Sequence, residues 1–346
     1  MKNAKENVLG MDLGDRKHAI HVLDTCGELL EASSIDNNIA SIKALSAKYP
    51  GIVFIMEAGT HSPWISRFLI SLGHKVLVAN PRKLKSIYGS DNKTDKRDAE
   101  MLARMYRFEP KLLYPIKHNS EKCQRDLAVL KSRNTLVNER TALMNTSRTT
   151  LKSLGVALPE SITPENITKK LKNELQRKDY KLAKPFMMVL ATLNKQIKLL
   201  DKQLSALAAK DYPITQKLQE IAGVGPITAL CYVLVIEDNQ RFRSNRDVGP
   251  FLGLVPKRDQ SGDSDKQLGI TKAGNNMLRR LLVNCSQYIL GNYGPPCQLR
   301  DSGLKIAGQG SKIAKKKAVI ATSRKLAVLM LALWKNEDSH YVPYHA

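Results

Sequence analysis

The sequence predicts an N-terminal α/β domain and a mainly α-helical C-terminal domain, joined by a helical middle segment. Strand and helix patterns alternate up to about residue 108, and helical periodicity alone runs from about 116 to 210. Glycine-containing turns between helices follow from about 211. A chain of 346 residues also exceeds the usual size of one domain. We therefore expect domain boundaries at 1–115, 116–210 and 211–346.

Three strand-like segments open the chain and are expected to form an antiparallel meander. The apolar runs Val8–Leu13 and His18–Leu23 precede the turn sequence Asp24-Thr25-Cys26-Gly27, which leads into Glu28–Ser33. Helices and strands then alternate, which predicts a mixed sheet covered by helices. These later segments are a helix at Ile39–Lys48, a strand at Ile52–Met56, a helix at Trp64–Leu72 and a strand at Lys75–Ala79.

The middle region has the apolar spacing of a coiled coil. Apolar residues from Phe186 to Leu207 step alternately by four and three, and others from Leu130 to Leu151 recur every seven residues. Two arrangements satisfy this pattern equally well. The helices can form a hairpin within one chain, or each can pair with another subunit in a dimerisation stalk. Residues 155–181 are expected to connect the helices.

The C-terminal region predicts helices at Arg246–Leu252 and at about Asn275–Ile289, and a basic final helix that ends near Trp334. Pro256–Gly269, between the first two helices, is expected to form a polar loop. Upstream, Gly223-Val224-Gly225 separates two helical segments. Such glycines permit a tight turn whose following amides can hold a phosphate, although helix packing explains them equally well.

Charge is the strongest compositional signal. Fifty-five Lys and Arg residues against thirty-two Asp and Glu residues give a formal net charge of +23. Such a surplus is typical of proteins that bind polyanions, because each neutralised phosphate releases counterions. No segment approaches the roughly 20 apolar residues of a membrane span, and the five cysteines lack the spacing of structural zinc sites. A ribosomal or membrane-surface protein can carry a similar charge. With no membrane span present, we expect a cytoplasmic nucleic-acid-binding protein with no membrane partner.

Four carboxylates stand at the ends of elements in the α/β region. Asp12 ends the first strand within Gly-Met-Asp-Leu-Gly, and Glu57 follows the strand Ile52–Met56. Asp95 and Asp98 are three residues apart and project from one face of a helix's first turn. Each alone is more simply a turn or helix-start residue. Together they can bind Mg²⁺ or Mn²⁺, which prefer oxygen ligands, and thereby support phosphoryl transfer.

Ser261 is a second candidate catalytic residue. A serine that attacks phosphorus needs a base or a metal, and positive charge near the phosphoryl oxygens. Lys257 and Arg258 lie close to it in the sequence. A Ser-Gly step is far more often a simple turn, and Ser264 is a nearby alternative nucleophile. The cations expected to contact phosphate backbones are Lys257, Arg258, Lys272, Arg279, Arg280, Lys315 and Lys316.

In this order, the motifs resemble those of the insertion sequence 110 family of transposases, also described as bridge-RNA-guided recombinases. The four carboxylates match the family's DEDD tetrad, which belongs to an RNase H-like domain of the Holliday-junction-resolvase (RuvC) type. The later motifs resemble its C-terminal transposase domain, whose nucleophile maps onto Ser261. Those motifs are Gly223-Val224-Gly225-Pro226, Phe251–Pro256, Gln260-Ser261-Gly262 and Gly269–Gly274. Gln260 departs from the Ser or Glu that is common before the nucleophile.

The resemblance implies a prokaryotic, nucleoid-associated recombinase that acts on double-stranded DNA at element ends and targets. It also implies a structured guide RNA that pairs with both DNAs. Dimers would pair into tetramers, and the carboxylates and Ser261 would form a composite site between subunits.

Two other functions are open on the residues alone. A structure-specific nuclease of the Holliday-junction-resolvase type would use the carboxylates to hydrolyse DNA with water. A non-catalytic nucleic-acid-binding protein is disfavoured, because none of the four carboxylates is replaced by an amide. A covalent protein–DNA adduct distinguishes the recombinase from the nuclease.

Overall fold

The computed structural model describes residues 6–84, 94–156, 162–167, 176–261, 264–308, 310–336 and 338–344. The chain divides into two compact units, Met1–Ser120 and Glu121–Ala346. The hydrophobic clusters of the first unit are separate from those of the second. The finer division of the second unit into a connector and a C-terminal domain stays a prediction.

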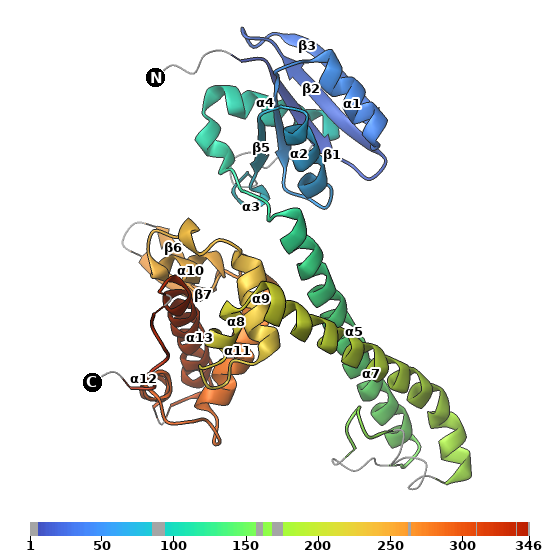
Figure 1. The fold of residues 1–346 in the computed structure, drawn as a ribbon, viewed down its shortest axis with the longest axis vertical. Coiled ribbons are helices and arrows are strands. Elements are labelled where there is room, and N and C mark those ends of the chain that lie inside the picture. The colour runs from blue at the N-terminus through green and yellow to red at the C-terminus, as the bar shows by residue number, and fades with distance from the viewer. Residues whose placement is uncertain are drawn as a thin grey trace. The chain divides into compact units, whose positions relative to one another are not determined.

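The first unit is built on a five-stranded mixed sheet with the strand order β3-β2-β1-β4-β5 (Figure 1). Strands β1, β2 and β3 form the expected antiparallel meander, while β4 and β5 run parallel to β1. The predicted mixed sheet is therefore confirmed. Its elements are β1 (Val8–Leu13), β2 (Lys17–Leu23), β3 (Leu29–Asp36), α1 (Ile39–Lys48), β4 (Val53–Glu57), α2 (Ser62–Ser71), β5 (Val76–Ala79), α3 (Pro81–Leu84), α4 (Asp95–Phe108) and the 3-10 turn η1 (Pro110–Leu113).

The two faces of this sheet bury different cores. Alternate residues of β1 and β4, such as Leu9 and Phe54, pack with α1 and α2. The residues between them, such as Val8 and Ile55, pack with Leu102 and other residues of α4. This division follows from the two-residue period of a strand, which turns successive side chains to opposite faces. Helix α4 therefore covers the face opposite α1 and α2.

Gly10 allows α4 to approach β1 closely. A Cβ atom at this position would lie 1.9 Å from the backbone oxygen of Ala99 and 2.9 Å from the amide nitrogen of Ala103. Real atoms cannot come so close, so any side chain at position 10 would push the helix away from the sheet. Gly10 therefore sets the distance between α4 and the strand that carries Asp12.

In the second unit, two long helices pack on each other within one chain. Helix α5 (Glu121–Ser153) lies against α7 (Arg177–Asp211), and the contact buries Met144, Leu151 and Leu190. Of the two arrangements left open by the heptad pattern, the described residues thus show the intramolecular hairpin. Much of the predicted connection at 155–181 lies outside the described residues.

The remaining helices surround α9, which is buried along most of its length. The phenol of Tyr232 in α9 donates a hydrogen bond of 2.6 Å to the backbone oxygen of Ala327 in α13. Helix α12 was not predicted from the sequence. The helices are α8 (Ile214–Leu218), α9 (Pro226–Ile236), α10 (Val248–Phe251), α11 (Asn276–Leu290), α12 (Gln298–Ala307) and α13 (Lys312–Lys335), with 3-10 turns at η2 (Asn239–Arg241) and η3 (Asn245–Asp247). Over the described ranges, no helix has the length and apolar character needed to cross a bilayer.

The prediction of a polar loop at Pro256–Gly269 is wrong. Strands β6 (Pro256–Ser261) and β7 (Ser264–Ile270) form an antiparallel pair in this segment. Most residues of both strands are polar, so the sequence lacks the alternation of apolar and polar residues by which strands are usually predicted. The two intervening residues, Gly and Asp, belong to the residue types that favour two-residue hairpin connections, and they were the available signal.

We predict that Gly10→Ala lowers the free energy of unfolding of the first unit by at least about 1–3 kcal/mol, the usual cost of overpacking. Gly59→Ala is the matched control, because a Cβ there meets nothing within 4 Å. Urea denaturation followed by circular dichroism measures both. Equal stability of the two variants would show that α4 tolerates displacement from β1.

Candidate active site

Asp12 and Glu57 stand at the ends of neighbouring parallel strands. The β1–β4 ladder pairs Met11 with Met56, and the two carboxylates are the next residues of their strands. Strand alternation turns both side chains to the face of Gly10, the face that α4 covers. Both residues are half-buried. The sheet register therefore brings these two predicted ligands to one place on one face.

The first turn of α4 supplies the other two carboxylates. Thr94 caps the helix, and its hydroxyl oxygen accepts a hydrogen bond of 3.4 Å from the amide of Arg97. Asp98 is only 9 % exposed and lies one turn before Leu102, on the buried stripe of the helix. Asp95 is exposed and lies one turn before Ala99, the residue that contacts Gly10. The helix thus presents both acids on its sheet-facing side.

The described residues do not gather these carboxylates into a ready-made ligand cluster. Within that part of the chain, no three Asp, Glu, His or Cys side chains are close enough together to hold an ion. Asp12, Glu57 and Asp98 each have another interaction partner. The donor chemistry nevertheless fits a hard divalent cation, because all four predicted ligands are carboxylates.

Two sets of contacts involving histidines hold the loop that follows Glu57. The Oγ of Ser62 accepts a hydrogen bond of 3.0 Å from the amide of Gly59 and lies 2.9 Å from Nε2 of His118. Nε2 of His61 lies 3.0 Å from the carboxylate of Asp15, beyond the end of β1. Burial lowers the pKa of His118, which favours a neutral ring there. Sequence reasoning missed these contacts, although His61 lies four residues after Glu57.

A close backbone contact supports the hairpin that carries Ser261. Gly253 and Gly274 both have left-handed φ values, of +68° and +72°. A Cβ on Gly253 would lie 2.2 Å from the amide nitrogen of Ala273, and one on Gly274 would lie 2.1 Å from the backbone oxygen of Phe251. The two family-like motifs on either side of the hairpin therefore meet at its base. We call this contact, formed by residues 251–254 and 272–274, the glycine bracket.

Arg279 was predicted to contact phosphate, but its side chain is buried. It holds the two segments of the glycine bracket together. Its side chain is 8 % exposed. The guanidinium donates hydrogen bonds of 3.0 Å to the backbone oxygen of Leu252 and 2.7 Å to that of Ala273. A third bond, of 3.2 Å, goes to the side-chain oxygen of Asn276. Sequence alone missed this role, because a buried arginine and an exposed one look alike in a helical pattern.

Ser261 itself is the last residue of β6 and is paired with Ser264, the first residue of β7. Its backbone position is described, but its side chain lies outside the described residues, as do Lys93 and Gly262 of the predicted motifs. The other predicted cations lie on the surface, and Arg280 also donates to the side chains of Asn134 and Asn138 in α5. The exposed cations are Lys257, Arg258, Lys272, Arg280, Lys315 and Lys316.

Packing accounts for one glycine of the Gly223-Val224-Gly225 motif. Gly223 has a φ of +91°, and a Cβ there would lie 2.9 Å from the ring of Tyr288. Gly225 is the N-terminal cap residue of α9. Both roles are structural, so the described residues give no reason beyond the exposed helix start to place a phosphate here.

Two family models match separate parts of the chain. A model for DEDD transposases of the IS110 type, described as transposase, matches residues 9–155. A second, described as the transposase IS116/IS110/IS902 family, matches residues 215–298. The first match contains all four predicted carboxylate ligands, and the second contains Ser261 and the glycine bracket. Together the matches cover well over half of the chain.

Individual relatives extend the similarity over nearly the whole length. The transposase for insertion sequence element IS1111A of Coxiella burnetii is 26 % identical over 98 % of this chain and 92 % of its own. The transposase for insertion sequence element IS1328 of Yersinia enterocolitica is 27 % identical over 81 % and 83 %. The pilin gene-inverting protein of Moraxella bovis is 28 % identical over 81 % and 79 %.

We predict that Arg279→Lys lowers the free energy of unfolding of the second unit by about 1–3 kcal/mol, because buried backbone oxygens lose hydrogen-bond partners. Arg280→Lys, at the exposed neighbouring position, should change it by less than about 0.5 kcal/mol. Chemical denaturation of the full chain measures both. A harmless Arg279→Lys would mean that the guanidinium does not hold the bracket together.

Proposed function

The chain belongs to the IS110 family of DEDD transposases, and from this premise we propose that it cuts and rejoins DNA with Ser261 as nucleophile and a divalent metal site as its partner. A transposase is a DNA phosphoryl-transfer enzyme, and its DEDD domain implies the use of a divalent metal. The observation that carries the proposal is the convergence of Asp12, Glu57 and the first turn of α4 on one face of an RNase H-like sheet.

The four carboxylates Asp12, Glu57, Asp95 and Asp98 are the proposed ligands. A bound Mg²⁺ or Mn²⁺ ion would activate an attacking oxygen and neutralise charge on a leaving one. The protein's own contribution is to hold the acids where that ion can bind. β-Sheet register fixes Asp12 and Glu57, and the Thr94 cap with the Gly10 contact fixes the start of α4.

Ser261 is proposed to attack phosphorus directly. Its Oγ would form a bond to phosphorus while one DNA P–O bond breaks, and the departing DNA hydroxyl would take up a proton as Ser261 loses one. A hydroxyl of the partner strand would then reverse the step and release the serine. Lys257 and Arg258, exposed on the same strand, supply positive charge for the phosphoryl oxygens.

The need to rejoin cut strands favours a recombinase over the alternative function, a junction-resolving nuclease. The Moraxella bovis relative is described as a gene-inverting protein. Inversion requires that every cut strand be rejoined, which hydrolysis by water cannot do. A covalent serine ester conserves the energy of the broken phosphodiester, so rejoining needs no other energy source.

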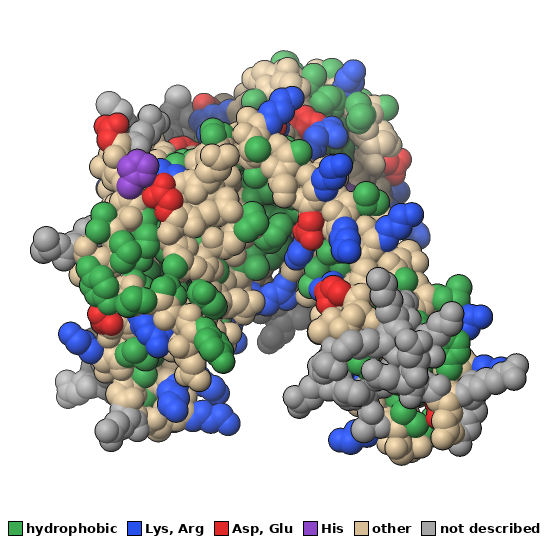
Figure 2. All heavy atoms as spheres, turned by 60° about the horizontal axis from the view of Figure 1, so that its bottom comes forward, with side chains coloured by type: hydrophobic (Ala, Val, Ile, Leu, Met, Phe, Trp, Pro, Cys, Tyr) green, Lys and Arg blue, Asp and Glu red, His purple; other side chains and the backbone are tan. Residues whose placement is uncertain are grey.

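We further propose a double-stranded DNA substrate, a structured guide RNA and assembly into dimers and tetramers. The net charge of +23 supports polyanion partners, and Figure 2 shows many Lys and Arg side chains on the visible surface. Subunit contacts through the long helices are supported by apolar residues that α7 leaves exposed. Met188, Val189 and Leu199 are 62 %, 51 % and 53 % exposed. A composite site between subunits is part of the same proposal.

The nucleophile is tested by incubating the protein with Mg²⁺, RNA from its flanking region and element-end DNA. Wild type should form a denaturation-resistant protein–DNA adduct, visible as a shifted band on a denaturing gel. Ser261→Ala should abolish the adduct, because it removes the hydroxyl that is proposed to attack phosphorus. Ser264→Ala, which changes the paired residue across the hairpin, should retain it.

Loss of the adduct in Ser264→Ala alone would move the nucleophile to the neighbouring strand. Cleavage without any adduct, undiminished in Ser261→Ala, would establish the nuclease instead.

The metal ligands are tested by changing one carboxylate to a thiol. Asp12→Cys should reduce cleavage in Mg²⁺ at least about 100-fold, and Mn²⁺ should restore part of it, because a thiolate is a poor ligand for Mg²⁺. Asp36→Cys is the matched control, since Asp36 is an exposed carboxylate at the end of β3, away from the four proposed ligands. The two variants are compared by rates of strand cleavage. Equal loss in both ions would argue against a metal contact by residue 12.

A further inference from the structure

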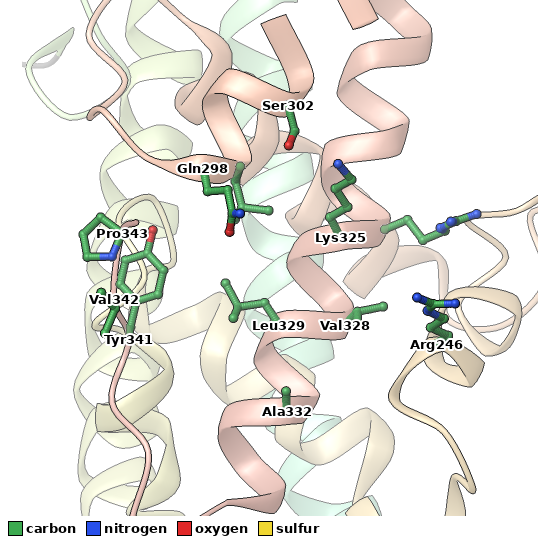
Figure 3. Close-up of a pocket in the computed structure, with 12 residues that line it drawn as sticks. Arg246, Gln298, Ser302, Lys325, Val328, Leu329, Ala332, Tyr341, Val342 and Pro343 are labelled. Atoms are coloured by element: carbon green, nitrogen blue, oxygen red, sulfur yellow. The ribbon is translucent and has the colours of Figure 1, made fainter. Parts of the chain in front are cut away.

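A pocket in the C-terminal unit is lined by residues that have no role in the proposed chemistry. This pocket, of about 690 Å³, is bounded by α13, the start of α12 and residues 341–343 (Figure 3). Its size falls within the roughly 300–1,000 Å³ of small-ligand sites. The pocket is therefore large enough for one nucleotide.

Three cations stand on one side of this pocket. Arg246, Arg324 and Lys325 line it and are exposed. Among the described residues, none of the three takes part in an ion pair. The stem of Arg324 lies against Gly249, where a Cβ would come within 3.0 Å of its Cγ. Packing thus supports the stem and leaves the guanidinium available to an anion.

The opposite side carries the ring of Tyr341 and apolar side chains, with the amide of Gln298 beside them. Figure 3 shows Tyr341 across the pocket from Arg246, with Leu329 of α13 between them. The tail that carries Tyr341 is tied down, because its amide donates a hydrogen bond of 3.0 Å to Glu220. Two residues later, the oxygen of Pro343 accepts a bond of 2.9 Å from the amide of Gln298. Burial is the largest cause that raises the pKa of Tyr341 to about 12, so its phenol is uncharged at neutral pH.

We propose that this pocket holds one unstacked nucleotide of a bound nucleic-acid strand. The base would lie against Tyr341 and Leu329, and its phosphate would lie among Arg324, Lys325 and Arg246. Aromatic and apolar side chains beside a cationic edge are the chemistry that recognises a splayed-out base and its phosphate. The inference rests on the proposed nucleic-acid function and adds to it a subsite outside the carboxylates and Ser261.

The cations continue beyond the pocket, which favours a strand over a free nucleotide. A second cavity, of about 680 Å³, lies along the same helix and shares Arg324 and Lys325 with the first. Lys316 and Lys317 line this second cavity. Lys317 is eight residues before Lys325 in the sequence, so the row of charges extends about 12 Å along α13. A free nucleotide has no phosphates to place there, whereas a strand does.

The test uses the full-length protein and a single-stranded oligonucleotide that carries 5-iodouracil, whose photoproducts report contact with aromatic rings. Ultraviolet crosslinking and mass spectrometry of the peptides should find an adduct on Tyr341. Ala332→Phe fills the pocket without changing its charge and should reduce that adduct at least about tenfold. Circular dichroism of the variant checks that it is folded.

A second set of variants changes only the charge of exposed side chains. Arg324→Gln combined with Lys325→Gln should weaken binding of the same strand about tenfold or more, because two phosphate contacts are lost. Lys198→Gln combined with Lys202→Gln removes two exposed cations of α7 and should change the affinity less than twofold. Fluorescence anisotropy at fixed salt measures both affinities.

The outcomes distinguish failure of the pocket proposal from failure of the proposed function. Strand binding with crosslinks only at other residues, or equal effects of the two double variants, would overturn the pocket and leave the transposase proposal intact. Crosslinking of Tyr341 by 5-iodouridine monophosphate but not by the strand would show a free-nucleotide site and also overturn the inference. A wild-type protein that binds no nucleic acid would overturn both.

Discussion

The contact between Gly10 and the backbone of Ala99 controls the geometry of the candidate active site. A hydrogen atom in place of a side chain lets α4 lie directly on β1, with 1.9 Å between an added Cβ and the oxygen of Ala99. The helix start, with Asp95 and Asp98, is thereby brought to the same face of the sheet as Asp12. Because the backbone itself makes this contact, no change of rotamer elsewhere can replace it.

The second unit has a similar close backbone contact, at the base of the hairpin that carries the candidate nucleophile Ser261. Gly253 and Gly274 bring two backbone segments into contact at the base of the β6–β7 hairpin, and Arg279 joins their carbonyl groups. A buried guanidinium is costly unless its donors are satisfied, and here three oxygens accept from it. Each unit therefore holds its candidate catalytic residues through close backbone contacts.

The carboxylates illustrate the difference between placing ligands and assembling a site. Sheet register and helix capping place Asp12, Glu57 and Asp98 near one another, yet no three ligating side chains are gathered around a common point within the described ranges. Mutual repulsion opposes closer approach until a cation offsets it. The fold thus supplies the position of the acids on one face of the sheet.

The sequence by itself determined the elements with strong local signals. The apolar runs of β1 and β4, the helix start with Asp95 and Asp98 and the heptad spacing of α7 are local patterns, so they could be predicted, with the four carboxylates and Ser261 as candidates. Tertiary structure alone decided which long-range partners these elements take. The polar hairpin has no local apolar pattern, and Arg279 is buried only because Leu252 and Ala273, distant from each other in sequence, meet beside it. Contacts between distant backbone segments leave no periodic signal along the chain.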